Sequence, residues 1–200
     1  MAAFETTPSA GMIFTACTIV DDGGLPLFDF CPKFEKRDYY ETMLFKNLVP
    51  SGTVVVRREI IDQIGGYDER IFIPNDWDLW LRIAEVTEVE YLPEPLTFYR
   101  RTATSISRDL ERQLREQVFV LQKAAQRNSS LGKITVREAL ASWYYQTGHA
   151  FLKSGRQRQA LLALLRSLGF CPVHWKTWSL LALILSGAIN ITSLRERLLR

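Results

Sequence analysis

This 200-residue sequence has few cysteines, a small net charge and no leader pattern in its first residues. Its three cysteines, Cys17, Cys31 and Cys171, are an odd number at spacings that fit neither a zinc site nor a disulfide framework, so we expect buried or inert thiols in a reducing compartment. The first fourteen residues lack the basic and apolar segments of a secretory signal, which favours the cytoplasm. The net charge is only +3 and the basic residues are scattered, so the sequence does not favour nucleic-acid binding.

Long hydrophobic runs are also scarce, with one exception near the C-terminus. Residues 177–194 run for eighteen positions without a charge, which is close to the shortest length of a membrane span. Serine, glycine, asparagine and threonine dilute this run, so we favour a buried helix over a spanning one. Contact of that helix with the inner face of the plasma membrane is left open. With 47% hydrophobic and 24% charged residues, the chain is expected to be globular.

The first hundred residues mix strand and helix signals, which predicts an α/β class, α+β in its order of elements. A β-branched run at 12–20 is followed by an Asp-Gly-Gly turn signal. A helix from Arg57 is expected to stop at Gly65 and Gly66, because glycine adopts the left-handed conformation of a C-cap. The other predicted elements are a helix at 37–48, a strand at 53–56, a helix starting around Asp76, and two strands, EVEYL and PLTFYR, around Pro93 and Pro95.

From about residue 107 onward the pattern predicts helices only. The segment 143–172 resembles one tetratricopeptide repeat, which is a pair of packed helices. In this resemblance Gly148 lets the two helices approach closely and Gly155 turns the chain between them. The remaining repeat positions are occupied by Phe151, Ala160 and Pro172. A single repeat cannot bury both faces of its helices, so we expect neighbouring helices and the final segment, SLRERLLR, to cover it.

The densest cluster of unusual residues is the run 52–84, GTVVVRREIIDQIGGYDERIFIPNDWDLWLRIA. Pro74 cannot sit inside a helix and Asn75 is a good N-cap, so the helix is expected to begin around Asp76. Acids in a first turn are favoured by the helix dipole, and Asp78 is suited to a capping role with Asn75. From the residues alone, Asp76 is therefore either a structural first-turn acid or a catalytic one.

This run resembles family 2 glycosyltransferases of the GT-A fold. After their nucleotide-binding half, those enzymes have a strand ending in Arg, a helix, a Gly-Gly-aromatic-Asp-Glu segment, a helix start rich in acids and tryptophan, and a strand pair ending in Tyr-Arg. The resemblance covers roughly residues 10–125, so we divide the chain into a partial GT-A domain at 1–125 and an all-helical tail at 133–200. The residues that carry it are Arg57, Gly65, Gly66, Tyr67, Asp68, Glu69, Asn75, Asp76, Trp77, Asp78, Leu79, Trp80, Arg82, Tyr99 and Arg100.

The resemblance implies inverting transfer of a sugar from a nucleotide-diphosphate sugar to a hydroxyl of a glycan or lipid, in cell-envelope polysaccharide synthesis. Asp76 is then the general base that accepts the hydroxyl proton. The candidate substrate-binding residues are Gly65, Gly66, Asn75, Trp77, Asp78 and Arg100. Each also has a structural alternative: the glycines can end a helix, Asn75 can be an N-cap, the tryptophan can lie in the core, Asp78 can cap, and Arg100 can pair with a surface acid.

Two positions depart from the family pattern. Asn75 stands where the family has its first carboxylate before Asp76, and Thr102 stands where many relatives have a histidine. The nucleotide-binding half that carries the Asp-x-Asp metal pair has no counterpart in the sequence, and His149 and His174 are isolated. We therefore expect Mg²⁺ or Mn²⁺ in the complete enzyme, with its ligands outside this chain, and a separate chain as one source of the nucleotide-binding half.

The rival interpretation is a non-catalytic interaction module. In this interpretation the helical tail binds a partner, while the first half keeps its fold without the chemistry. Both interpretations predict little or no sugar transfer by the chain alone, because a pyrophosphate leaving group needs its negative charge neutralised, usually by a divalent ion.

Overall fold

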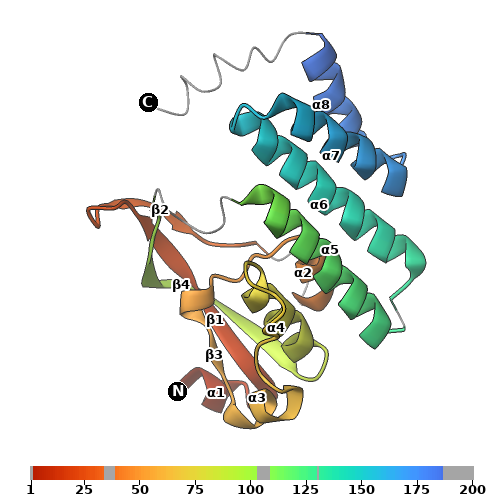
Figure 1. Ribbon diagram of the computed structural model, residues 1–200. Coiled ribbons are helices and arrows are strands. Elements are labelled where there is room, and N and C mark those ends of the chain that lie inside the picture. The colour runs from red at the N-terminus through yellow and green to blue at the C-terminus, as the bar shows by residue number, and fades with distance from the viewer. Residues whose placement is uncertain (1, 34–38, 103–108, 130, 187–200) are drawn as a thin grey trace. The chain divides into compact units, whose positions relative to one another are not determined.

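The computed structural model describes residues 2–33, 39–102, 109–129 and 131–186 (Figure 1). The chain divides into two compact units, Met1–Arg108 and Asp109–Arg200. The first combines helices with an open mixed sheet, and the described residues of the second are helical and connecting segments, so the predicted mixed α/β class with a helical C-terminal part is confirmed. The division falls earlier than the expected residue 125, because the helix that begins at Leu110 packs on the helices that follow it.

The strands of the first unit are arranged around β1 (Ala10–Val20). β4 (Glu88–Arg100) pairs parallel with β1 along its whole length. β2 (Pro26–Phe30) and β3 (Val55–Val56) pair antiparallel with opposite ends of β1, so they share its other edge. Nine of the eleven residues of β1 are buried, which marks it as the central strand and agrees with the strand predicted at 12–20.

The predicted Asp-Gly-Gly turn joins β1 to β2. The amide nitrogen of Asp21 donates to the carbonyl oxygen of Leu25 at 3.0 Å, and the amide nitrogen of Gly24 donates to the carbonyl oxygen of Asp21 at 3.1 Å. Gly24 has a φ of 88°, a conformation that glycine adopts without steric cost. The turn therefore leads directly into β2, whose exposed residues continue the sheet.

β4 is one continuous strand, whereas the sequence predicted two strands around Pro93 and Pro95. Proline lacks the N–H that a ladder needs, and the pairing with β1 slips here, from Thr15 opposite Leu92 to Ala16 opposite Pro95. The side of β4 away from β1 pairs with no other described strand, so a missing donor there costs little. The prediction of a break was wrong because irregular pairing on an edge strand accommodates both prolines.

α2 (Tyr39–Phe45) and α4 (Asn75–Ala84) supply the helical part of the first core. The ring of Phe14 on β1 stacks on Tyr91 of β4 at a centroid distance of 4.9 Å and meets Tyr39 of α2 edge to face at 6.0 Å. These contacts seat α2 on the sheet. Among the fully buried side chains of this core are Met12, Phe14, Met43, Leu44, Trp77, Leu81 and Ile83.

Three short elements complete the described part of the first unit: α1 (Ala2–Thr6), a 3₁₀ turn (Ser51–Thr53) and α3 (Arg58–Ile64). The 3₁₀ turn occupies the start of the strand predicted at 53–56, which leaves only β3. α3 ends at Gly65, whose φ is 82° and whose amide donates to the carbonyl oxygen of Ile61 at 3.0 Å. Gly66 follows with a φ of 69°, so the predicted glycine stop is confirmed.

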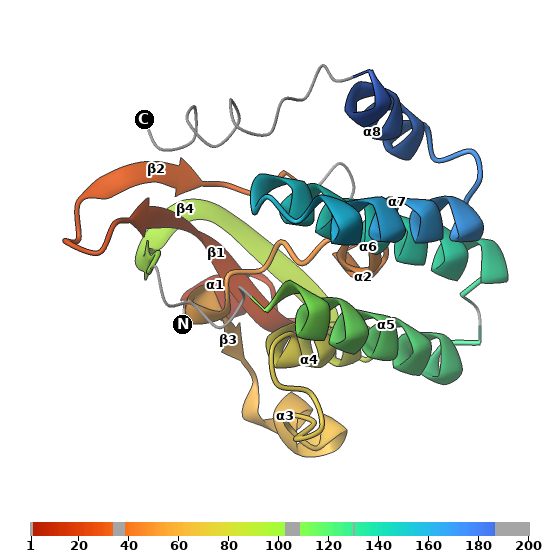
Figure 2. The ribbon, with the colours of Figure 1, turned by 45° about the horizontal axis from the view of Figure 1, so that its top comes forward.

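The described helices of the second unit are α5 (Leu110–Arg127), α6 (Lys133–Lys153), α7 (Gln157–Phe170) and α8 (Trp175–Leu185). α5 begins after Asp109, whose carboxylate accepts a hydrogen bond from the amide nitrogen of Arg112 at 3.0 Å. α6 and α7 lie side by side as a helical hairpin (Figure 2). The core that joins α6, α7 and α8 consists of Phe151, Leu152, Ala160, Ala163, Leu164, Leu180 and Leu181.

Gly148 lets α6 and α7 approach closely, as the sequence predicted. A Cβ at this position would lie 2.9 Å from Cγ and Cδ2 of Leu164 and 3.3 Å from the carbonyl oxygen of Ala160. Gly155 turns the chain between the helices with a φ of 76°, and Phe151 is buried between them. These residue roles are the predicted ones, while descent from a tetratricopeptide repeat stays a prediction.

No helix within the described residues is long and apolar enough to cross a membrane. α8 contains the first part of the uncharged run at 177–194 and ends at Leu185. The rest of that run and the final segment at 193–200 lie outside the described residues, so the predicted covering role of that segment stays a prediction.

Candidate functional site

A pocket of about 270 Å³ opens in the first unit, where the end of β1 meets the segment before the 3₁₀ turn and the start of α4. Its wall is mainly apolar with a few polar side chains, which is the usual composition of a ligand site. Asp76 supplies the one carboxylate among the described lining residues. The lining residues are Cys17, Ile19, Phe30, Asn47, Leu48, Val49, Pro50, Ser51, Asp76 and Tyr99.

Hydrogen bonds to both oxygens fix the carboxylate of Asp76 at the pocket wall. Its Oδ1 accepts from the amide nitrogen of Trp77 at 2.6 Å, and its Oδ2 accepts from the hydroxyl of Ser51. Ser51 belongs to the 3₁₀ turn, so the second bond joins two segments that are far apart in the sequence. A carboxylate held in place beside a cavity has the geometry that a general base needs.

The start of α4 decides where Asp76 points. Pro74 is the residue that precedes the helix, and Asn75 is the first helical residue. The sequence predicted Asn75 as the N-cap, but its Oδ1 instead accepts a hydrogen bond from the amide nitrogen of Asp76 at 2.8 Å. The carbonyl oxygen of Pro74 accepts from the amide nitrogen of Asp78 at 3.1 Å and closes the first turn. The helix therefore begins one residue earlier than predicted, and Asn75 does not line the pocket.

Burial raises the pKa of Asp76 above its usual range, because removal from water disfavours the charged carboxylate. Hydrogen bonds from Ser51, from the backbone of Trp77 and Asp76, and from the side chain of Asn47 lower the pKa and offset part of this effect. A carboxylate with a raised pKa is a stronger proton acceptor. The environment of Asp76 therefore suits proton transfer as well as helix initiation.

Asp78 lies in the core and not in the pocket wall. Its side chain is fully buried, and its Oδ2 lies 2.9 Å from Nε of Arg82. Arg82 also donates from Nη1 to the carbonyl oxygen of Ile64 at 3.0 Å and from Nη2 to that of Gly66 at 2.5 Å. The predicted cap and substrate contact do not fit this position, because an aspartate four residues before an arginine pairs with it along the helix. The pair ties α4 to the end of α3.

Gly65 and Gly66 end α3 and do not line the pocket. A Cβ added at either position would meet no atom within 4 Å, so neither glycine is required by a close approach of another group. Their positive φ values explain why glycine occurs here. The structural alternative accounts for both residues, and the predicted substrate contact is not supported.

Trp77 is fully buried and cannot offer a flat face to a sugar. Its Nε1 donates to the carbonyl oxygen of Met43 at 2.7 Å, which fixes α4 against α2. Trp80 is also buried. Burial agrees with the structural alternative, a core position, because the apolar stripe is the core-facing side of α4, and the predicted substrate contact of Trp77 is not supported.

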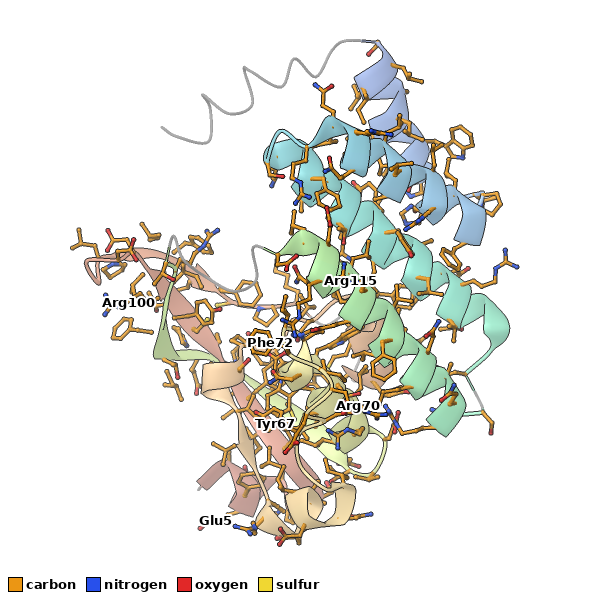
Figure 3. The ribbon with its side chains drawn as sticks, viewed as in Figure 1. Glu5, Tyr67, Arg70, Phe72, Arg100 and Arg115 are labelled. Carbon is orange, nitrogen blue, oxygen red and sulfur yellow. The ribbon has the colours of Figure 1, made fainter. Side chains whose placement is uncertain are left out.

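Arg100 lies beside the turn between β1 and β2 (Figure 3). Its Nη1 donates to the carbonyl oxygen of Asp22 at 2.6 Å, so the contact shown is a backbone carbonyl and not a surface acid. The contact with a donor pyrophosphate stays a prediction. Tyr99, the residue before it, lines the pocket. Successive side chains of a strand point to opposite faces, which accounts for the different positions of these neighbours.

Several lining residues were missed by the sequence analysis. Asn47 and Ser51 flank Pro50 in a connection between a helix and a strand, and such connections often carry binding residues, so this composition was the available signal. Cys17 is buried on β1, and its thiol pKa is raised by burial and by the nearby Cys31 and Asp29, which keeps it neutral. Cys31 is exposed, so of the two expected alternatives, a buried or an inert thiol, only the second remains for it.

No group of three or more His, Cys, Asp and Glu side chains could hold a metal ion within the described residues. His149 and His174 both lie in the second unit, with ring centroids 6.5 and 5.4 Å from that of Tyr145. Burial lowers the pKa of both imidazoles, with Lys153 and Lys176 acting in the same direction on His149 and His174 respectively. Both imidazoles therefore pack against Tyr145 within the helical unit.

Comparison with known proteins does not identify a family. No protein-family model matches the sequence, and a search of curated proteins finds no match. The resemblance to family 2 glycosyltransferases therefore stays a prediction from motif residues. The pocket and the environment of Asp76 are the observations on which a function can be argued.

Proposed function

We propose that the first unit is the acceptor-side part of an inverting GT-A glycosyltransferase. In this proposal it transfers a sugar from a nucleotide-diphosphate sugar to a hydroxyl of a glycan or lipid, at the cytoplasmic side of cell-envelope polysaccharide synthesis. The supporting observation is the carboxylate of Asp76, which is fixed at the wall of a pocket and has its pKa raised by burial. The choice of glycosyltransferase family in this proposal rests on the resemblance of the motif residues quoted above.

Asp76 acts on the acceptor hydroxyl in a single displacement. As the hydroxyl oxygen bonds to the anomeric carbon, its proton passes to the Asp76 carboxylate. The bond between the anomeric carbon and the diphosphate oxygen breaks, its electron pair leaves with the nucleoside diphosphate, and the anomeric configuration inverts. The pocket volume of about 270 Å³ is slightly below the range of about 300–1,000 Å³ for small-molecule sites, so it suits the reacting end of an acceptor.

Exposed apolar residues beside this pocket form a candidate docking surface for the nucleotide-binding part. Ile19 of β1 pairs with Phe28 on one side and with Tyr99 on the other, and both neighbours are about half exposed or more. Leu96 and Phe98 on β4 are 68% and 73% exposed. Apolar residues gathered in this way mark interaction surfaces. We infer that a separate segment or chain packs on this end of the sheet, where it would bring a donor sugar close to Asp76.

The divalent cation expected for the complete enzyme belongs to that nucleotide-binding part. Mg²⁺ or Mn²⁺ would neutralise the charge that develops on the diphosphate. Because the described residues form no metal-binding group, no step of the proposal assigns a ligand in this chain. The contribution of this chain is to position the acceptor and to accept its proton.

A complementation experiment tests the proposal. The full chain is fused to the nucleotide-binding segment of a family 2 glycosyltransferase, and the transfer of labelled sugar is compared for wild type, Asp76→Asn and Asp62→Asn. Asp62 is an exposed acid of α3 that pairs with Arg58, so it is a matched control. We expect a loss of about 100-fold or more for Asp76→Asn, the effect of removing a general base, and no loss for the control. Equal transfer by wild type and Asp76→Asn would remove Asp76 from the mechanism.

Partner binding by the helical unit is the second candidate function. A pocket of about 270 Å³ lies between α5, α6 and α7, with Tyr144 and Phe151 in its wall and Arg115 and Arg166 among its polar residues. This function requires no chemistry from Asp76. Partner binding is favoured if Asp76→Asn leaves sugar transfer by the fused protein unchanged, while variants of Arg115 and Arg166 impair function in the cell.

A further inference from the structure

Acidic residues are absent from a long part of the helical unit. No Asp or Glu occurs between Glu138 and Glu196, a stretch that contains Lys153, Arg156, Arg158, Arg166 and Lys176 among its described residues. Arg156 pairs with Glu111 of α5. The side chains of Lys153, Arg158, Arg166 and Lys176 are all exposed. The surface of α7 and α8 is therefore positive, although the chain as a whole carries only +3.

A stripe of large apolar side chains lies on the exposed face of α8. Trp175 is 68% exposed, Trp178 is 56% exposed and Leu185 is 81% exposed, while Val173 just before the helix is 83% exposed. The spacing of the three helical residues places them on one face. The ammonium group of Lys176 lies 5.8 Å from the ring centroid of Trp175. The stripe thus combines tryptophan, leucine and lysine.

A buried polar network holds this stripe outward. The hydroxyl of Ser167 on α7 donates to the carbonyl oxygen of Ala141 on α6 at 2.8 Å and shares a hydrogen bond of 2.9 Å with the hydroxyl of Thr177 on α8. Nδ1 of His174 lies 2.7 Å from the same Thr177 oxygen. Thr177, Leu180 and Leu181 are buried on the inner face of α8. The rotation of α8 about its axis is therefore fixed, and its tryptophans stay on the surface.

The composition of this surface matches a lipid headgroup layer. Indole rings have an apolar body and one polar N–H and favour the boundary between water and hydrocarbon, while lysine and arginine are attracted by anionic headgroups. A second copy of the chain is disfavoured as the occupant, because the dimer would bring like charges together. α8 has eleven residues within the described part of the chain and exposes one apolar face, which suits a helix that lies in the interface.

We propose that the exposed face of α8, formed by Val173, Trp175, Lys176, Trp178 and Leu185, docks the helical unit on the surface of an anionic phospholipid bilayer. The apolar stripe enters the headgroup region, and the exposed cations of α7 and α8 contact the anionic lipids. The proposal does not depend on the glycosyltransferase activity, since it uses no residue of the pocket. It assigns to the second unit a role that is separate from the chemistry of the first.

Sedimentation of the full chain with vesicles tests this docking. Vesicles of phosphatidylcholine alone are compared with vesicles that also contain phosphatidylglycerol, at low and high salt. The variants are Trp175→Gln, Lys176→Glu and, as a control of equal exposure in the other unit, Leu25→Gln. Trp175 and Lys176 are exposed, so far-UV circular dichroism should show folded variants.

We expect binding to the anionic vesicles that weakens with salt, a loss on the order of tenfold for each α8 variant, and no change for Leu25→Gln. In the vesicle assay, the proposal would be overturned by wild-type chain that stays in solution with anionic vesicles, or by binding that is equal in wild type, Trp175→Gln and Lys176→Glu. If Trp175→Gln fails to fold, the proposal is still tested by the salt and lipid dependence of vesicle binding by the wild type and by the effect of Lys176→Glu on that binding. Self-association of the wild type that Trp175→Gln abolishes would identify a second copy as the occupant and would also contradict it.

Discussion

The two units of this protein place their charged side chains in opposite ways. In the first unit, neighbouring aspartates on one helical turn are drawn inward, Asp76 to a pocket wall and Asp78 into the core. In the second unit, α7 and α8 contain no acid, and Arg158, Arg166 and Lys176 on these helices are exposed. Inward acids that need specific partners suit a site for chemistry. Outward cations around exposed tryptophans suit a surface for docking.

The largest expected effect comes from removing a buried acid of the first unit. Asp78→Ala leaves Arg82, whose side chain is only 12% exposed, without its carboxylate partner. Removing one member of a buried pair costs about 3–5 kcal/mol. We expect a loss of this size in the free energy of unfolding of the first unit, measured by urea denaturation with hydrogen exchange of α4 as the local readout.

Asp62→Ala is the matched control, because Asp62 and Arg58 form an exposed pair on α3 at the same spacing. Exposed pairs contribute about 0–1 kcal/mol. If Asp78→Ala costs no more than the control, the buried pair does not hold α4 to α3, and the contrast between inward and outward charge loses its energetic basis.

A smaller effect is expected in the second unit, from filling the close contact between α6 and α7 at Gly148. Gly148→Val introduces a Cβ 2.9 Å from Leu164, where the hairpin has no space. Overpacking of this kind costs about 1–3 kcal/mol. Gly169→Ala is the control, because a Cβ there meets no atom within 4 Å and alanine favours a helix over glycine by about 1 kcal/mol.

We expect Gly148→Val to lower the midpoint of thermal unfolding, with faster hydrogen exchange of the amides in α6 and α7. Gly169→Ala should leave the midpoint equal or raise it. A Gly148→Val protein as stable as the wild type would mean that the close helix contact is not what stabilises the hairpin.

Elements that depend on local signals could be predicted from the sequence. The glycine stop after α3 and the hairpin around Gly148 and Gly155 follow from backbone conformation and side-chain size at single positions. β4 could not be predicted as one strand, because the effect of Pro93 and Pro95 depends on pairing with β1. Whether a proline breaks a strand is decided by position in the sheet, which a local pattern does not contain.

The candidate site was predictable only at Asp76. Ser51 and Tyr99 meet Asp76 at the pocket through folding of distant segments, so no local spacing indicates them. For Trp77 the same helical stripe is compatible with a core position and with a ligand platform, and a core position is the more common case. The core position of Asp78 had a usable signal in Arg82 four residues later, because that spacing favours an ion pair along a helix.

The pKa of Asp76 has a defined consequence for pH dependence. Burial raises the pKa in the folded state above that of the unfolded chain, so the folded state holds the proton more tightly. The contribution to stability is fully present below the unfolded value and is lost as the pH rises through the folded value. A carboxylate whose pKa is raised in this way holds an accepted proton more tightly, which is the property that the proposed base requires.

An NMR titration of the Asp76 carboxyl carbon in the full chain tests the central claim most directly, with Asp76→Asn to assign the resonance. We predict a midpoint above the ordinary aspartate value of about 3.9, and a still higher midpoint in Ser51→Ala, because the Ser51 hydroxyl stabilises the charged form. A midpoint at or below the ordinary value, unchanged in Ser51→Ala, would contradict the account and leave Asp76 as a first-turn acid of α4.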